Sequence, residues 1–207
     1  APTRRIRELD ALRGVGATMV VLFHFTTMFD RFYDHPSTFT LSFDVGYYGV
    51  NLFFLVSGFV IYMTLERTKS ARHFIVSRAT RLFPVYWIAV LITFAAVALI
   101  GLPGKERTVW ELLANLTMLH EYAGIRHIDG VYWTLSIELA FYIWMFAFFR
   151  AGLLQRPLRM FLIWLTTNIL IFGTASALGI TLPNVFGIAL FTAYGNLFFA
   201  GIGFYIW

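Results

Sequence analysis

Long apolar stretches without charged residues divide the chain. Four of them carry no Asp, Glu, Lys or Arg (14–29, 45–65, 82–104 and 160–207), and a fifth, 130–149, carries only Glu138. A helix needs about 20 apolar residues to cross a hydrocarbon layer roughly 30 Å thick, so the last stretch is long enough for two spans, separated near Pro183. The pattern therefore predicts six transmembrane helices, at 9–29, 45–65, 82–101, 131–149, 160–179 and 186–207.

Continuous apolar runs favour helices over the strands of a membrane barrel, in which apolar and polar residues alternate over about ten positions. Hydrophobic residues make up 59% of the 207 residues and charged residues 13%, against about 45–50% and 25% in soluble domains. So few charged groups could not cover a water-soluble surface, and 23 Phe residues exclude a disordered chain. We predict an all-α fold, a polytopic transmembrane helix bundle.

Basic residues are unequally distributed between the predicted connections. With a cytoplasmic N-terminus, twelve of the 16 Lys and Arg residues fall in the inner segments 1–13, 66–81 and 150–159, and four fall in outer loops. Because basic residues concentrate on the cytoplasmic side, the net charge of +5 is a topology signal, and no nucleic-acid partner is expected. The apolar run after Arg7 continues to Phe29 without a small-residue cleavage site, which favours a retained first span over a signal peptide. We expect a multi-pass protein of the plasma (inner) membrane.

The outer loop 102–130 is the one long connection. Within it, residues 109–119 have apolar side chains at helical spacing with two polar interruptions. This pattern predicts a short amphipathic helix lying on the outer surface of the membrane.

Arg13 and His24 are ionisable groups inside or beside the first span, where a charge costs about 2.5–3.5 kcal/mol. They are 11 residues apart, so at about 100° per residue they share one helix face, with a rise of about 16 Å between them. Two ordinary alternatives remain: a hydroxyl or carbonyl satisfies the imidazole, and Arg13 snorkels or pairs with Asp10.

Glu138 lies about six residues into the fourth predicted span from outside, at a depth similar to that of His24. A carboxylate facing an imidazole would fix its tautomer and favour general-base chemistry. The alternative is a structural Glu138 paired with an Arg or Trp. The sequence does not say whether the two helices are neighbours.

Arg78 and Arg81 are spaced i,i+3 on one helix face at the inner membrane surface. Two guanidinium groups side by side suit a phosphate or pyrophosphate, whereas the alternative is that they only set topology and contact anionic lipid. No third metal-ligating residue lies at a useful spacing from His120 and His127, so no metal site is predicted.

Four segments together resemble motifs of acyltransferase family 3, whose members are integral membrane O-acyltransferases. They occur in the family's order and extend from Leu9 to about Tyr142. The segments are Leu9-Asp10-Ala11-Leu12-Arg13-Gly14 followed by His24; Gly49-Val50-Asn51-Leu52-Phe53-Phe54-Leu55-Val56-Ser57-Gly58; Arg78-x-x-Arg81-Leu82-Phe83-Pro84; and Trp133-Thr134-Leu135-Ser136-Ile137-Glu138-x-x-Phe141-Tyr142.

The resemblance implies transfer of an acyl group, commonly acetyl, from cytoplasmic acyl-CoA to a hydroxyl of a sugar, polysaccharide or lipid-linked acceptor, often at the extracytoplasmic face. It implies functional roles for Arg13, His24, Arg78 and Arg81. We expect His24 and Glu138 to be catalytic and the three arginines to bind the acyl-CoA donor. Supporting roles are expected for Asp10, Asn51, Ser57, Trp133 and Tyr142.

His24 could act as a general base on the acceptor hydroxyl or as a nucleophile that forms an acyl-imidazole. A rival function is a transporter or flippase of a lipid-linked or phosphorylated sugar, with His24 and Glu138 as a proton relay. A non-catalytic scaffold is disfavoured because buried ionisable groups are costly. Residues 1–207 are expected to form a single membrane acyltransferase domain that lacks its C-terminal spans, since members of the family usually have more than six.

Overall fold

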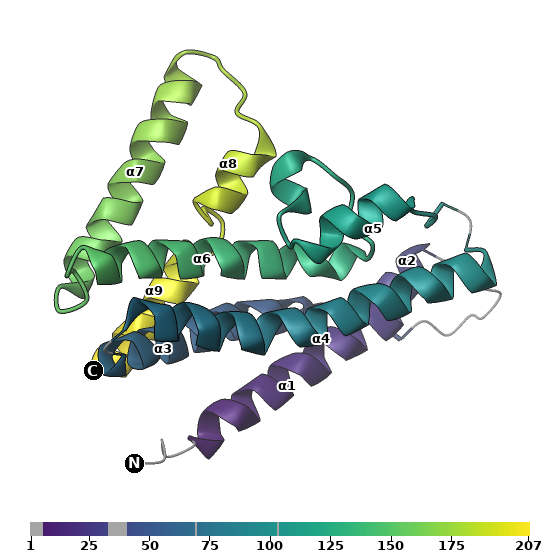
Figure 1. The fold of residues 1–207 in the computed structure, drawn as a ribbon, viewed down its shortest axis with the longest axis horizontal. Helices are drawn as coiled ribbons and strands as arrows, with labels where there is room; N and C mark the ends of the chain where they lie inside the picture. Colours follow the sequence, from purple (N-terminus) through teal and green to yellow (C-terminus); the bar gives the residue numbers. More distant parts are fainter. Residues whose placement is uncertain (1–5, 33–40, 69, 103) are drawn as a thin grey trace. The chain divides into compact units, whose positions relative to one another are not determined.

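A computed structural model describes residues 6–32, 41–68, 70–102 and 104–207, and every regular element in these ranges is a helix or a helical turn. The elements fall into two compact units, Ala1–Val60 with Asn196–Trp207, and Ile61–Gly195. Figure 1 draws the elements in sequence colours. The predicted all-α fold is confirmed.

The first unit begins with a nearly continuous helix. It consists of α1 (Arg7–Phe23), a π-helical turn η1 (His24–Met28) and α2 (Phe29–Phe32). A 3-10 turn η2 (Asp44–Tyr48) then leads into α3 (Gly49–Arg67).

Helix α3 crosses α9 (Gly195–Ile206) at two glycines within this first unit. A Cβ at Gly58 would overlap the carbonyl oxygen of Phe198, and a Cβ at Gly201 would overlap that of Leu55. The rings of Phe54 and Phe198 pack beside the crossing with centroids 4.9 Å apart. Small residues thus allow the two helix backbones to touch, as is common in membrane bundles.

The second unit is built around α4 (Ala71–Ile100) and α6 (Trp133–Arg150), which run antiparallel. Tyr86 packs on Tyr132, and Phe74 packs on Tyr142, with ring centroids 5.3 and 6.4 Å apart. The connection between them holds α5 (Val109–Leu116) and the 3-10 turns η3 (His120–Ala123) and η4 (Gly130–Tyr132). Helices α7 (Pro157–Ala177) and α8 (Asn184–Ala189) follow, as Figure 1 shows.

Five helical segments of the described chain are long and apolar enough to cross a membrane, and they match the first five predicted spans. Their bounds are Arg7–Arg31, Asp44–Arg67, Ala71–Ile100, Gly130–Arg150 and Pro157–Ala177. The third begins 11 residues earlier than predicted, because no Gly or Pro interrupts the basic stretch 71–81. Arg78 and Arg81 therefore lie inside a helix and not at its start.

The sixth predicted span, 186–207, is wrong as a single helix. It is broken between α8 and α9, and α9 has 12 residues, about 18 Å of helix. Trp164 of α7 supports the break: its indole N–H donates to the carbonyl of Leu190 (2.8 Å), and its ring stacks on Phe191, whose φ is +38°. Gly195 is required there because a Cβ would overlap the same indole ring. The prediction of a single span rested on the absence of charged residues from 186–207, which does not exclude a break.

The short helix predicted in loop 102–130 is confirmed as α5. Its N-terminus carries a capping box, in which the Thr108 hydroxyl accepts from the Glu111 backbone N–H and the Glu111 carboxylate accepts from that of Thr108. Its two polar side chains, Glu111 and Asn115, are buried.

Candidate active site

His24 stands at the first position of the π-helical turn that follows α1. Its Nδ1 lies 2.8 Å from the carbonyl oxygen of Val20. A carbonyl can only accept, so Nδ1 carries the hydrogen and Nε2 of the neutral ring holds a lone pair. Single π-helical turns inside α-helices occur frequently at functional sites. The backbone thus supplies the tautomer control that the sequence suggested for Glu138.

Arg13 lies in α1, which is α-helical from Arg7 to Phe23. The regular helix supports the prediction that Arg13 and His24 share one face. The side chain of Arg13 is half-buried, as is that of Asp10 one turn earlier, and both have interaction partners.

Asn51 and Ser57, two of the expected supporting residues, lie on α3 in the first unit. The Asn51 side-chain carbonyl oxygen is buried and has no hydrogen-bond partner among the described residues. A buried amide oxygen of this kind can accept a hydrogen bond from a ligand. Ser57 has interaction partners of its own.

Arg78, Tyr142 and Glu138 come together between α4 and α6 in the second unit. The Tyr142 hydroxyl donates to Glu138 Oε1 at 2.6 Å, and the Arg78 guanidinium interacts with both side chains. Arg78 is half-buried, and its Nε and Nη1 have no acceptor among the described residues. We name these three residues the arginine cluster. It presents a partly dehydrated cation whose donors are free to bind an anion or a carbonyl.

Arg81 is near Arg78 and is exposed. Phe74 packs against Tyr142 and stacks with Phe146 at 6.5 Å between centroids, which fixes the register of α4 on α6 beside the cluster. The two arginines that the sequence placed side by side therefore differ in environment. The Arg78 side chain faces α6, and the Arg81 side chain is exposed. Trp133, at the opposite end of α6 from Phe146, packs on Tyr194 at 5.4 Å.

The structure therefore groups the predicted site residues into two sets. Unit one holds Asp10, Arg13, His24, Asn51 and Ser57, and unit two holds Arg78, Arg81, Trp133, Glu138 and Tyr142. Glu138 and His24 belong to different units, so their predicted pairing stays a prediction. The pairing of Glu138 with Tyr142 could have been read from their i,i+4 spacing.

A second polar group, in the connection between α4 and α6, was not predicted. His120 Nε2 lies 2.7 Å from His127 Nδ1, and His127 Nε2 lies 3.4 Å from Glu121 Oε1. Burial and the neighbouring His127 lower the pKa of His120 to about 4, so this ring is neutral at pH 7. Burial would raise the pKa of Glu121, but the neighbouring His127 holds it below its ordinary value. The seven-residue spacing of the two histidines, across a turn of unknown shape, carried no usable signal.

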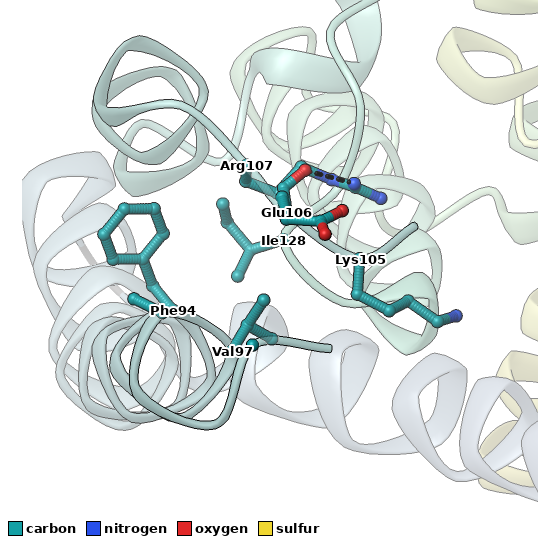
Figure 2. Close-up of a pocket in the computed structure, with 8 residues that line it drawn as sticks. Phe94, Val97, Lys105, Glu106, Arg107 and Ile128 are labelled. Atoms are coloured by element: carbon teal, nitrogen blue, oxygen red, sulfur yellow. Dashed lines mark hydrogen bonds between the residues drawn. The ribbon is translucent and has the colours of Figure 1, made fainter. Parts of the chain in front are cut away.

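A cavity of about 120 Å³ lies beside the same connection. Figure 2 shows Phe94 and Val97 of α4 facing Ile128 there, with Arg107 nearby. None of the predicted site residues lines it. Across the described ranges, no group of three or more His, Asp or Glu residues could hold a metal ion.

Comparison with known proteins gives a family and several relatives. The family described as acyltransferase domain matches residues 6–207. An exopolysaccharide production protein, ExoZ, of Rhizobium meliloti is 35% identical over 108 residues, which cover 48% of this chain and 33% of that protein. Nodulation protein 10 of Rhizobium leguminosarum bv. viciae is 30% identical over 115 residues, 46% of this chain and 31% of that protein.

A third relative, protein 2 in the picA locus of Rhizobium radiobacter, is 32% identical over 111 residues, which cover 50% of this chain and 53% of that protein. These matches span between about a third and a half of the relatives' own lengths. No solved structure matches.

Proposed function

Because this chain belongs to the membrane acyltransferase family whose motifs it carries, acyltransferase family 3, we propose that it is an O-acyltransferase. The donor is an acyl-CoA, with acetyl as the expected acyl group, and the acceptor is a hydroxyl of a sugar, polysaccharide or lipid-linked carbohydrate. The names of two relatives, which refer to exopolysaccharide production and nodulation, support a carbohydrate acceptor. The expected location is the plasma (inner) membrane, where the product enters the cell envelope.

The observation that carries this proposal is the hydrogen bond from His24 Nδ1 to the Val20 carbonyl, because it leaves Nε2 as the nitrogen that can accept a proton. A neutral imidazole with an exposed lone pair removes a proton from a hydroxyl, a role that contributes about 10²–10⁴-fold to a rate. The proton of the acceptor hydroxyl moves to Nε2 while the hydroxyl oxygen attacks the thioester carbonyl. The leaving thiolate then takes up a proton as free coenzyme A.

The arginine cluster supports binding of the donor. Its guanidinium donors suit the phosphate groups or the amide carbonyls of an acyl-CoA, and the exposed Arg81 adds positive charge beside it. Tyr142 is hydrogen-bonded to Glu138, and both side chains interact electrostatically with the half-buried Arg78. No metal enters this proposal.

A second route gives the same products through His24 as nucleophile. Nε2 would attack the thioester and form an acyl-imidazole, which the acceptor hydroxyl then cleaves. Incubation with radiolabelled acetyl-CoA and no acceptor separates the routes: labelled protein indicates the nucleophile, and unlabelled protein with acceptor-dependent coenzyme A release indicates the general base.

The test of the proposal is the His24→Ala variant of the full-length protein in nanodiscs, with His73→Ala as the matched control because His73 is an exposed histidine on α4. We expect acyl transfer to fall about 10²–10⁴-fold in the first variant and to stay unchanged in the second. Full turnover by His24→Ala contradicts both routes. Transport of an intact labelled sugar without coenzyme A release contradicts the enzyme class.

A further inference from the structure

The outward face of α5 is apolar although the helix lies in a connecting loop. Val109, Trp110 and Leu113 are 63%, 70% and 53% exposed, and none of the outward side chains of this helix carries a charge. The polar side chains, Glu111 and Asn115, point inward instead. A helix on the surface of a water-soluble protein has the opposite arrangement.

The inward polar groups are hydrogen-bonded. Asn115 donates its amide N–H groups to the carbonyls of Glu111 and Arg126 and accepts from the backbone N–H of Ile128. Glu111 accepts from Arg126 Nε at 2.9 Å and from the Thr108 backbone. The two polar side chains of α5 are thus paired within the protein, as polar groups inside a bilayer must be.

Contacts with α4 fix the depth of α5. Tyr86 donates its hydroxyl to the carbonyl of Asn115, and the Trp87 indole donates to that of Leu116, each at 2.8 Å. With 30 residues, α4 is about 45 Å long and exceeds a hydrocarbon layer of roughly 30 Å by about 15 Å. Wherever that layer lies along α4, it includes the middle of the helix, and Tyr86 and Trp87 are the 16th and 17th residues.

An exposed apolar side chain of α4 lies at the end of α5. Trp87 is 44% exposed, and its indole N–H donates to the Leu116 carbonyl at the end of α5; Ile88 and Leu91 of the same helix are exposed as well. Three charged residues precede α5: Figure 2 shows Lys105, Glu106 and Arg107 beside Phe94 and Val97, farther along α4. There they can reach the headgroup layer. A fourth charged side chain, that of the exposed Arg126, pairs with the inward Glu111.

We propose that α5 is a re-entrant membrane helix whose face formed by Val109, Trp110 and Leu113 contacts lipid acyl chains. The connection that holds α5 then enters the bilayer and leaves it on the same side, and α5 does not lie on the membrane surface. Contact with acyl chains would keep these three apolar side chains out of water, where they would form an exposed apolar patch. The proposal is independent of the enzymatic function.

Single-cysteine variants test the proposal directly, since the sequence has no cysteine. Spin labels are placed at Leu113→Cys and Trp110→Cys in nanodiscs, with Ile92→Cys on the exposed face of α4 as lipid control and Glu106→Cys as water control. Collision rates with oxygen, which partitions into lipid, and with a water-soluble nickel chelate are measured for each label.

The ratio of oxygen accessibility to nickel accessibility is compared between labels. At Leu113 and Trp110 we expect this ratio to equal that at Ile92 and to be at least about fivefold higher than that at Glu106. Nickel accessibility like that of Glu106 would overturn the proposal, because the face would then be in water. Low accessibility to both reagents would also overturn it, because another protein surface, from a second copy or from further spans, would then cover the helix.

Discussion

Two polar groups in the unit Ile61–Gly195 differ in how completely their hydrogen bonds are satisfied. In the network around Asn115, the side-chain amide N–H groups and the side-chain oxygen are all hydrogen-bonded, and these bonds hold α5 to the following loop. The arginine cluster has a partnered carboxylate and phenol, yet the Nε and Nη1 donors of its cation have no acceptor among the described residues. We interpret the satisfied network as structural, and we propose that the unsatisfied donors of the half-buried Arg78 bind a ligand.

The sharpest way to break this comparison is to remove the cation. We expect Arg78→Ala to weaken apparent affinity for the acyl-CoA donor about 100-fold, since a hydrogen bond to a charged group contributes about 1.5–3 kcal/mol. Steady-state kinetics in donor concentration measure it, with Arg72→Ala, an exposed arginine of the same helix, as control. Equal losses in both variants would mean that only the overall positive charge matters.

Removing Asn115 tests the other side of the comparison. Asn115→Ala deletes three hydrogen bonds at a fully buried position, so we expect the local opening free energy of residues 109–128 to fall by about 3 kcal/mol. Hydrogen–deuterium exchange reports this value. Donor affinity should change little, and a 100-fold loss of donor affinity in this variant would show that the two groups are not separate in function.

Acid should loosen the loop by a smaller amount. His120 has an ordinary pKa of 6.5 when unfolded and about 4 when folded, so between these values the unfolded loop binds a proton that the folded loop does not. Stability therefore falls as the pH falls, by about 2 kcal/mol between pH 7 and pH 5. The lowered pKa of Glu121 acts in the same direction at lower pH.

The ionisable groups around His120 are Glu121, His127 and, farther out, Arg107, whose Nε donates to the His127 carbonyl. Hydrogen–deuterium exchange at both pH values, corrected for intrinsic rates, measures the effect. His120→Gln should abolish most of the pH dependence, and an unchanged pH dependence in that variant would assign it to other groups.

The sequence predicted the fold where composition alone decides it. Apolar runs of membrane length, four uncharged and one with Glu138 alone, located five spans to within a few residues at most ends, and the apolar periodicity of 109–119 located α5. The break before α9 escaped prediction because it depends on Trp164, which is 26 residues from the carbonyl it binds. Local patterns carry no information about such a long-range contact.

For the site, the motifs singled out the residues but could not show their partners. The tautomer of His24 is set by a backbone carbonyl four residues earlier, a contact that any helix offers and no sequence pattern reveals. The position of Arg78 inside α4, facing Tyr142, depends on the packing of Phe74 against α6. The inward orientation of Glu111 and Asn115 depends in the same way on tertiary contacts with α4 and with the following loop.

Mass spectrometry of cell-surface glycans and lipids tests the central claim most directly. Cells that produce the full-length protein are compared with cells that lack it and with cells that produce its His24→Ala variant. The account predicts one carbohydrate species that carries an added acyl mass, expected to be that of acetyl, only in the first strain. Identical glycan and lipid masses in all three strains would contradict it.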